Sequence, residues 1–163
     1  MGKHYFIGAS DLARGRSGVG LISPRLISPQ ANLGPMTDPL IAAAIHVRGN
    51  AHAPYSKFRV GAALEDEKGH IHTGCNIENA TYGLTLCAER VAVFKAISEG
   101  ARRFRRMAVV ADTDKLTPPC GACRQILWEF CGDIELTLAN LSGEKETVRL
   151  GTLFPRAFDA SFL

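Results

Sequence analysis

The chain has 163 residues, of which 46% are hydrophobic and 21% are charged, and its formal net charge is +3. This is the composition of one globular domain with a single core, and no apolar run approaches the roughly 18–20 residues that a membrane span needs. Residues 36–163 hold 15 basic and 15 acidic residues, so they offer no excess positive charge to a polyanion. We therefore expect neither a nucleic-acid partner nor a membrane partner.

The first 35 residues differ from the rest of the chain. They are rich in Gly, Ser and Pro, contain the tandem repeat "LISPRLISPQ" at 21–30, and carry four basic residues against one acidic residue. Such a composition does not supply a packed core. We expect residues 1–35 to be a disordered extension and residues 36–163 to be the folded domain.

The domain is predicted to begin with a helix and a hairpin. Thr37 or Asp38 is expected to cap the helix, with Pro39 at its first position. Residues 57–65, "KFRVGAALE", alternate between apolar and other positions, which is typical of a strand. Residues 70–78, "HIHTGCNIE", are expected to form the second strand of the hairpin.

Helices and strands alternate through the rest of the chain. We expect helices over about 87–98 and 120–130, a strand buried on both faces at 107–111, and strands near 134–139 and 146–150. The alternation predicts an α/β fold, with a mixed sheet of about five strands and helices on both faces.

Two patterns could suggest further binding sites. His70 and His72 share one face of a predicted strand, but without a third donor we expect them to be surface residues rather than metal ligands. The basic run "RRFRR" at 102–106 could contact phosphates, although a solvated rim before a strand is the simpler interpretation.

Five cysteines are present, an odd number that cannot pair completely within the chain. No signal-peptide segment is recognisable, so we expect a reducing cytoplasm, where a CxxC pair more often binds metal or acts in catalysis than forms a structural disulfide. For "PPCGAC" at 118–123, three hypotheses arise: a redox pair, half of a metal site, or two buried core residues.

The placement of three cysteines favours the metal site. Cys87 opens one predicted helix, and Cys120 and Cys123 open another. Helix N-termini favour thiolate over thiol. Three thiolates leave the fourth tetrahedral position of a zinc ion free, as in catalytic zinc sites. Cys75 lies in a strand and Cys131 about two turns beyond Cys123, so both fit the site poorly.

Two neighbours of Cys87 could complete a catalytic centre. Glu89, in the same helical turn, can reach a water on the metal without binding the metal. Arg90, three residues from Cys87, can offset the net negative charge of three thiolates on one divalent ion. Taken alone, each would fit a solvent-facing side chain equally well.

Together these motifs resemble a known family. "CAE" followed by "PCGAC" resembles the signature of the zinc-dependent cytidine deaminase superfamily in its three-cysteine form. "SKFRVGAAL", "GCNIENATYG", "CAERVA", "PPCGACRQ" and "LFPRAF" resemble, in order, the motifs of the small homotetrameric cytidine deaminases of pyrimidine salvage. The resemblance covers roughly residues 37–160. It implies a three-layer α-β-α fold and a cytoplasmic homotetramer whose active sites are shared between subunits.

The resemblance also implies roles at the reaction centre. Cys87, Cys120 and Cys123 would hold one Zn²⁺ per chain, which makes hydroxide available to attack C4 of cytosine. Glu89 would move protons from that water to ring N3 and to the leaving ammonia, and the backbone at Ala88 would contact the base. This chemistry is the family's own and is carried over by the resemblance.

Other residues would bind the nucleoside. Asn76 and Glu78, on one face of the predicted strand, would bind the ribose hydroxyl. Phe58 would pack on the pyrimidine, although it also fits a core position at the start of a strand. Ala80 and Tyr82 would come from a neighbouring subunit and Phe158 from another.

The implied reaction is hydrolytic deamination of cytidine and 2′-deoxycytidine to uridine and 2′-deoxyuridine plus ammonia. Alternatives of the same fold are a deaminase of the blasticidin S type, against which the "NIEN" motif argues, and a polynucleotide cytosine deaminase, against which the balanced charge argues. A non-catalytic zinc-binding module would have no need of Glu89.

Overall fold

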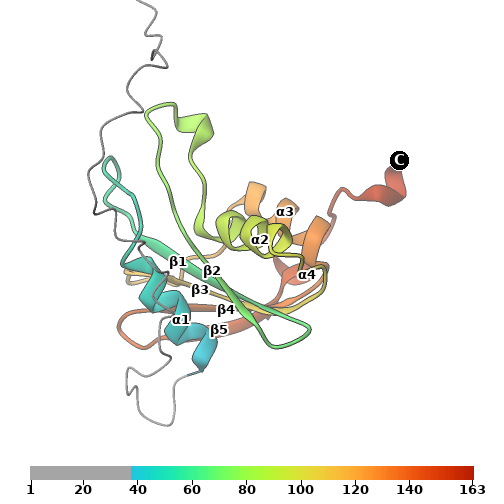
Figure 1. Ribbon diagram of the computed structural model, residues 1–163, viewed down its shortest axis with the longest axis horizontal. Coiled ribbons are helices and arrows are strands. Elements are labelled where there is room, and N and C mark those ends of the chain that lie inside the picture. Colours follow the sequence, from blue (N-terminus) through green and yellow to red (C-terminus); the bar gives the residue numbers. More distant parts are fainter. Residues whose placement is uncertain (1–37) are drawn as a thin grey trace, which may run out of the picture. The chain divides into compact units, whose positions relative to one another are not determined.

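The computed structural model of the chain describes residues 38–163, and the expected extension at 1–35 lies outside them. Five strands form one sheet (Figure 1): β1 (Val60–Asp66), β2 (Ile71–Cys75), β3 (Phe104–Ala111), β4 (Glu135–Asn140) and β5 (Lys145–Arg149). Their order is β2-β1-β3-β4-β5, with β3 and β4 parallel and the other neighbours antiparallel. The predicted mixed sheet of five strands is confirmed.

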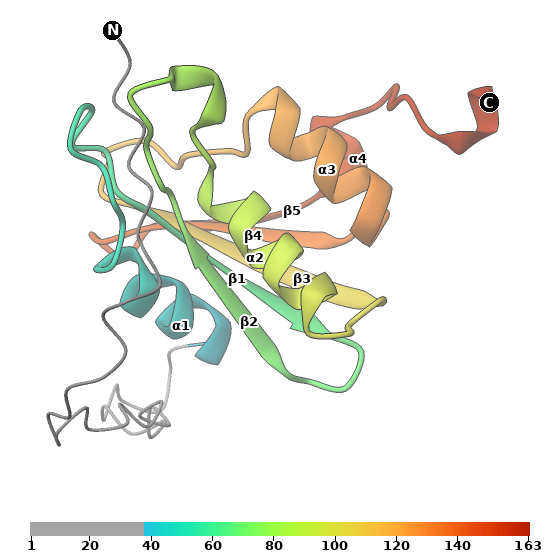
Figure 2. The same cartoon turned by 45° about the horizontal axis from the view of Figure 1, so that its top comes forward.

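Helices cover both faces of this sheet. The helices are α1 (Pro39–Arg48), α2 (Ala88–Ser98), α3 (Gly121–Cys131) and α4 (Leu150–Leu153), with short 3₁₀ turns η1 (Tyr82–Leu84) and η2 (Ala160–Phe162). Helix α1 lies on one face, and α2 and α3 lie on the other (Figure 2). This confirms the three-layer α-β-α arrangement. Within residues 38–163, none of the helices combines the length and apolar character needed to cross a bilayer.

The first helix begins where the sequence predicts. Asp38 is its N-cap and accepts a hydrogen bond from the Leu40 amide at 2.9 Å, while Pro39 follows at the first helical position. Helix α1 buries Leu40, Ile41 and Ala44 against small residues of β1, β3 and β4. Gly61 permits this contact, because a Cβ there would lie 2.0 Å from the Ala44 carbonyl oxygen.

On the opposite face, α2 packs directly against the backbone of β2. Ala88, Ala92 and Ala96, four residues apart, are all fully buried on this side of the helix. Gly74 of β2 faces them, and a Cβ at Gly74 would lie 2.4 Å from the Ala92 nitrogen and 2.5 Å from the Ala88 oxygen. This close contact fixes the N-terminal end of α2, where Cys87 and Glu89 lie.

The central strand follows its prediction, whereas the hairpin strands are shorter than predicted. Residues 107–111 are buried within β3. Strand β1 begins only at Val60, and β2 ends at Cys75. Beyond that end, the Asn76 amide still donates to the Val60 carbonyl at 3.3 Å, and its side chain adds two bonds: its Oδ1 accepts from the Val60 amide and its Nδ2 donates to the Phe58 carbonyl, each at 2.8 Å.

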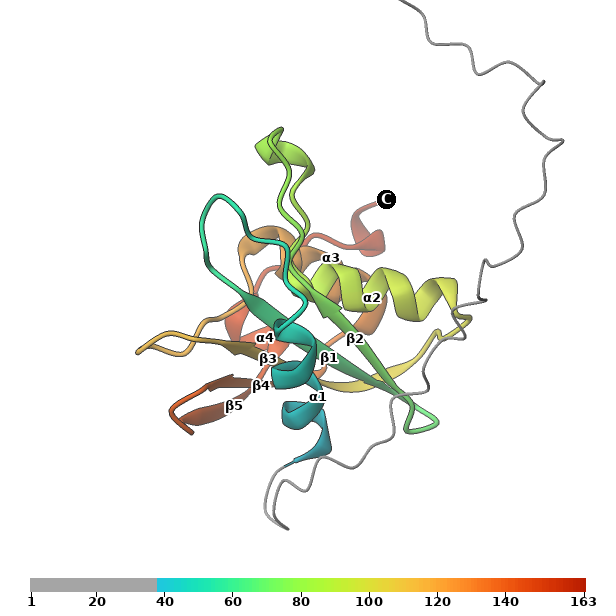
Figure 3. The same cartoon turned by 60° about the vertical axis from the view of Figure 1, so that its left-hand side comes forward.

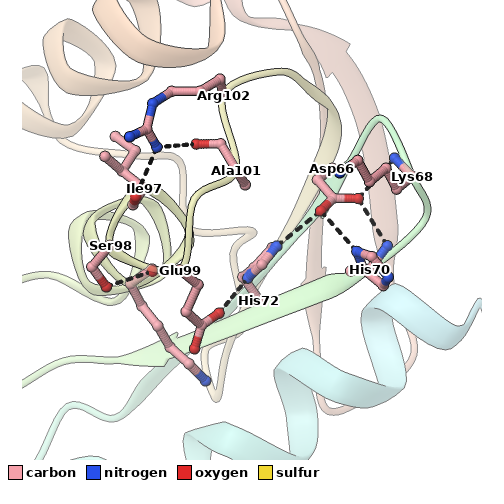
Figure 4. Close-up of polar contacts among 10 residues, drawn as sticks. Asp66, Lys68, His70, His72, Ile97, Ser98, Glu99, Ala101 and Arg102 are labelled. Carbon is pink, nitrogen blue, oxygen red and sulfur yellow. Dashed lines mark hydrogen bonds and ion pairs between the residues drawn. The ribbon is translucent and has the colours of Figure 1, made fainter.

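One of the two histidines was wrongly predicted to be a surface residue. His72 is 8% exposed, with Nε2 facing Asp66 Oδ2 at 3.2 Å and Nδ1 facing Glu99 Oε2 at 2.7 Å (Figure 4). His70 is exposed, as predicted, and also faces Asp66. Burial opposes ionisation of Asp66, but hydrogen bonds from the His70 amide, the His72 ring and the Lys68 amide outweigh it and hold the pKa of Asp66 well below its usual range.

The basic run at 102–106 is not simply a rim before a strand, because β3 begins at Phe104. Arg106 pairs with Glu65, its register partner on β1, at 2.7 Å, and with the Asp38 carboxylate that caps α1. Arg102 donates to two main-chain carbonyls near the end of α2. At these positions the basic side chains connect elements of the fold.

Candidate active site

Three cysteines from two helix N-termini come together in space. Cys87 is the N-cap of α2, Cys120 is the N-cap of α3, and Cys123 lies in the first turn of α3. Their sulfur atoms all lie within 4.8 Å of one another, and the sulfurs of Cys87 and Cys120 are 4.0 Å apart. Within residues 38–163, this is the only group of three or more candidate ligands with such spacing.

The spacing of the sulfurs fits a zinc ion. With Zn–S bonds of about 2.3 Å and tetrahedral angles, two ligand sulfurs lie roughly 3.8 Å apart. The observed 4.0 Å between Cys87 and Cys120 is close to that value. Cys131 does not belong to this group, and burial raises the pKa of its thiol to about 12. Three soft thiolate donors therefore suit zinc and leave one position for a further ligand.

The pKa values of two of these thiols, Cys87 and Cys123, are shifted in opposite directions. The interaction with the neighbouring Cys123 thiol, with smaller contributions from Arg90 and against the effect of burial, lowers the pKa of Cys87 to about 5. The same interaction raises the pKa of Cys123, and burial raises it further. Zinc binds cysteine as thiolate, so metal binding at this cluster would release protons from its thiols.

Arg90 lies against the sulfur of Cys87. Its Nη2 donates to the Cys87 sulfur at 3.6 Å and to the Thr85 carbonyl at 2.7 Å. The second bond fixes the guanidinium, because Thr85 lies in the segment that leads into α2. Positive charge is thus placed beside one of the three ligand sulfurs.

Glu89 is buried beside the cluster and not solvent-facing. The residue is 5% exposed, in the first turn of α2. Burial raises the pKa of its carboxyl and the negative charge on Cys87 adds to that effect, whereas the interaction with its own amide opposes it. Ala88, between Cys87 and Glu89, is fully buried. A carboxyl group with a raised pKa next to a metal site is suited to proton transfer.

A second group of the predicted residues lines a hollow. Figure 3 shows the loop before β1 and the loop that carries η1 rising from the same end of the sheet. Between them, Glu78, Tyr82 and Thr85 line a hollow together with Tyr55 and Ser56. The rings of Tyr55 and Tyr82 meet edge to face with centroids 6.1 Å apart. Because the Thr85 carbonyl accepts from Arg90, this hollow is linked to the cysteine cluster.

The remaining nucleoside-binding candidates differ in their exposure to solvent and in their hydrogen bonding. Phe58 precedes β1 and is 39% exposed, so it is not a core residue. Asn76 is buried, and its amide group bonds to the backbone on either side of Arg59. Neither Asn76 nor Glu78 lies on a strand, contrary to the prediction, because β2 ends at Cys75.

The residues expected to act between subunits are exposed. Ala80 is exposed, Tyr82 is 76% exposed and Phe158 is 56% exposed. The C-terminal segment runs away from the sheet (Figure 1), and the ring of Phe158 stacks on that of Phe162 with centroids 5.4 Å apart. Gln125 of α3 donates to the Phe158 carbonyl at 2.8 Å, which anchors the segment.

Three residues that line the hollow were not singled out from the sequence. Tyr55 and Ser56 directly precede Lys57 and Phe58. A signal was available for Ser56, since its hydroxyl lies two residues before an aromatic candidate in a turn-prone stretch. Thr85 has no comparable signal, because its contribution is a main-chain carbonyl.

Comparison with known proteins identifies the family. The sequence model described as the cytidine and deoxycytidylate deaminase zinc-binding region matches residues 37–137. The chain belongs to this family. The matched region includes Cys87, Glu89, Cys120 and Cys123, and zinc is accordingly the metal for the three-thiol cluster.

Individual relatives agree with this assignment. A cytidine deaminase of Sporosarcina psychrophila is 53% identical over 120 residues, covering 73% of this chain and 88% of that protein. The crystal structure of cytidine deaminase from Burkholderia pseudomallei matches with a TM-score of 0.71 and 47% identity, covering 73% of this chain and 96% of that one. A blasticidin-S deaminase of Bacillus cereus is more distant, with 28% identity over 108 residues, 61% of this chain and 76% of that protein.

Proposed function

We propose that the protein is a zinc-dependent cytidine deaminase, which hydrolyses cytidine and 2′-deoxycytidine to uridine and 2′-deoxyuridine with release of ammonia. The observation that carries this proposal is the buried carboxyl of Glu89 in the first turn of α2. Cys87 caps the same helix and belongs to a three-thiol cluster that leaves one ligand position open. A zinc site with a purely structural role would usually be closed by a fourth protein ligand.

The chain's own groups account for the proton transfers. Zinc, when bound by the three cysteines, supplies a Lewis acid that makes hydroxide available from water near neutral pH. Glu89 accepts the proton of that water and delivers it to ring N3 of the pyrimidine. It then helps to protonate the amino group that leaves C4 as ammonia. Its raised pKa suits a group that must both accept and release a proton.

The hollow at the end of the sheet is suited to the sugar. Glu78 would accept the ribose hydroxyl, with Asn76 beside it, while Phe58 would pack on the pyrimidine and the backbone at Ala88 would contact the base. A ribose hydroxyl would donate to this carboxylate a hydrogen bond that free cytosine does not offer. This explains why a nucleoside would be preferred to free cytosine.

We also propose that the enzyme is a cytoplasmic homotetramer of pyrimidine salvage. Ala80 and Tyr82 would reach the substrate from one neighbouring subunit and Phe158 from another. The exposure of large apolar side chains on these segments supports assembly: Tyr82 is 76% exposed and Phe158 is 56% exposed. Closed symmetric assembly is the usual outcome for soluble oligomers.

Two alternatives fit the molecule less well. The blasticidin S type is disfavoured by the "NIEN" motif at 76–79 and by the lower identity of that relative. A polynucleotide substrate is disfavoured because Arg106 is paired with Asp38 and Glu65, so less of the basic run is free for phosphates.

An absorbance assay on the zinc-loaded protein tests the function directly. Cytidine, 2′-deoxycytidine, cytosine and blasticidin S are compared side by side, with ammonia release as a second readout. We expect turnover of the two nucleosides and little or none of cytosine and blasticidin S. Faster turnover of blasticidin S, or no turnover of either nucleoside by protein with verified zinc, would overturn the proposal.

A further inference from the structure

The carboxylate of Glu78 is held by a single loop. Its Oε2 accepts from the Tyr55 amide at 2.9 Å and from the Ser56 amide at 3.2 Å, while its Oε1 accepts from the Ser56 hydroxyl. The hydroxyl bond is the main reason that the pKa of Glu78 lies below its usual value. A carboxylate offers about four acceptor positions, so these three bonds leave one, on Oε1.

The Ser56 hydroxyl also fixes the neighbouring aromatic residue. Its oxygen accepts a hydrogen bond from the Phe58 amide at 3.0 Å while donating its proton to Glu78. A hydroxyl has one proton to donate and can accept as well, so both bonds form together. One side chain thus connects the residue expected to bind the ribose with the residue expected to pack on the base.

The backbone between Ser56 and Phe58 adopts a demanding conformation. Lys57 has φ of 61°, and among the described residues it is the only non-glycine with positive φ. This left-handed region is unfavourable for a residue with a side chain, and such conformations persist where surrounding contacts impose them. The Lys57 amide bonds to the Ala53 carbonyl at 3.2 Å, and the Ser56 hydroxyl bonds to the Phe58 amide across the turn.

From this geometry we propose that Ser56 is a positioning residue for nucleoside recognition. Ser56 holds Glu78 so that Oε1 keeps one free acceptor site for a sugar hydroxyl. It also fixes the backbone of Phe58, whose ring would pack on the base. The inference rests on the proposed function. The substrate hydroxyl would then share Oε1 with Ser56, so that removing the Ser56 hydroxyl weakens binding of the sugar in particular.

Substrate analogues separate this role from a general structural one. The kcat and KM of wild type and Ser56→Ala are measured with 2′-deoxycytidine and with 2′,3′-dideoxycytidine, which differs from it only in lacking the 3′-hydroxyl. We expect Ser56→Ala to lower kcat/KM for 2′-deoxycytidine roughly tenfold, chiefly through KM, because it loses a hydrogen bond to a charged group. For the dideoxy analogue the loss should be within about twofold, since the 3′-hydroxyl that Glu78 would bind is absent.

Further variants complete the test. In a Glu78→Gln background, Ser56→Ala should have little additional effect, because both changes act on one contact. Ser56→Cys preserves the shape of the side chain, but its thiol is a weak hydrogen-bond donor, so it should show the same dependence on substrate. It replaces Ser56→Ala in the test if that variant folds poorly. Ser98→Ala removes an exposed hydroxyl that donates only to the Lys95 carbonyl, and it should match wild type.

The outcomes distinguish the two proposals. If wild type with full zinc deaminates neither cytidine nor 2′-deoxycytidine, the proposed function is wrong and Ser56 has no such role. If wild type is active but Ser56→Ala and Ser56→Cys impair both analogues equally, or add fully to Glu78→Gln, only the positioning role of Ser56 is overturned.

Discussion

Arg90 places its Nη2 atom 3.6 Å from the sulfur of Cys87, three residues earlier in the chain. The same nitrogen bonds to the Thr85 carbonyl, so the guanidinium is held beside the sulfur and does not sample solvent freely. Three thiolates give a divalent ion a net charge of minus one, which weakens it as a Lewis acid. A fixed positive charge at one sulfur offsets part of that excess.

Replacing Arg90 by Gln tests this charge compensation. We expect zinc content to be retained, because the three sulfurs remain, and kcat to fall roughly tenfold or more. Hydrogen bonds to charged groups contribute about 1.5–3 kcal/mol, which sets the scale. Steady-state kinetics and metal analysis measure the two quantities, with the exposed Arg103→Gln as control. Unchanged turnover would mean that Arg90 only supports the loop at Thr85.

Replacing Cys120 by Ala tests the ligand set. We expect loss of both zinc and activity, since two thiolates do not make a stable tetrahedral site. Zinc is measured by elemental analysis after gel filtration. Cys131→Ala is the matched control, because Cys131 is a buried thiol outside the cluster and should leave zinc content near one per chain. Full zinc occupancy in Cys120→Ala would refute the assignment.

The Glu89→Gln variant separates proton transfer from metal binding. Gln preserves the shape of the side chain but does not carry protons, so zinc and the fold should remain while turnover falls. General acid–base catalysis typically contributes about 10²–10⁴-fold, and we expect a loss at or beyond the upper end because Glu89 serves several transfers. Rates and zinc content are compared with those of Glu129→Gln, an exposed residue of α3. Activity within tenfold of wild type would exclude the proposed role.

Complementation between two inactive variants tests whether active sites are shared. Glu89→Ala chains still supply Phe158, and Phe158→Ala chains still carry Glu89 beside their own cysteines. Coexpressed hybrids should therefore contain some sites with both groups and exceed the activity of either parent. The activity of purified hybrids is the measurement. If verified hybrids show only the average of the two parents, Phe158 acts within its own chain or has no role in the site.

The stability of the folded protein should depend on pH through the ionised carboxylate of Asp66. Its pKa in the folded protein lies below the ordinary value, so its contribution is complete above about pH 4 and is lost as the pH falls below that. Asp66→Asn should consequently be less stable than wild type at neutral pH, and the gap should narrow below pH 4. Urea unfolding at several pH values measures it, with the exposed Asp114→Asn as control. A gap that stays constant down to pH 3 would contradict this account.

The elements that sequence patterns predict well depend on local chemistry. Asp38 and Pro39 start α1 because capping requires only adjacent residues, and the apolar run at 107–111 marks the strand buried between two layers. The cysteine cluster was predictable for the same reason, since each ligand stands at a helix start.

Other features depend on residues far apart in the chain. His72 is buried because Asp66 and Glu99 face its two ring nitrogens, and no alternation pattern indicates those partners. Strand β2 ends early because the Asn76 side chain bonds to the backbone at Phe58 and Val60. The pairing of Ser56 with Glu78 likewise spans 22 residues and appears only when the two loops meet.

The cysteine ligands also join two parts of the chain that are distant in sequence. Cys87 and Cys120 are 33 residues apart, and the segment between them contains α2 and the central strand β3. A metal that binds both cysteines therefore acts as a cross-link closing a large loop. By the chain-entropy relation for cross-links, closing a loop of this length lowers the conformational entropy of the unfolded chain, which corresponds to about 4 kcal/mol of stability. The zinc ion would thereby stabilise the folded state in addition to its role in catalysis. A chain deprived of zinc would be easier to unfold as well as inactive.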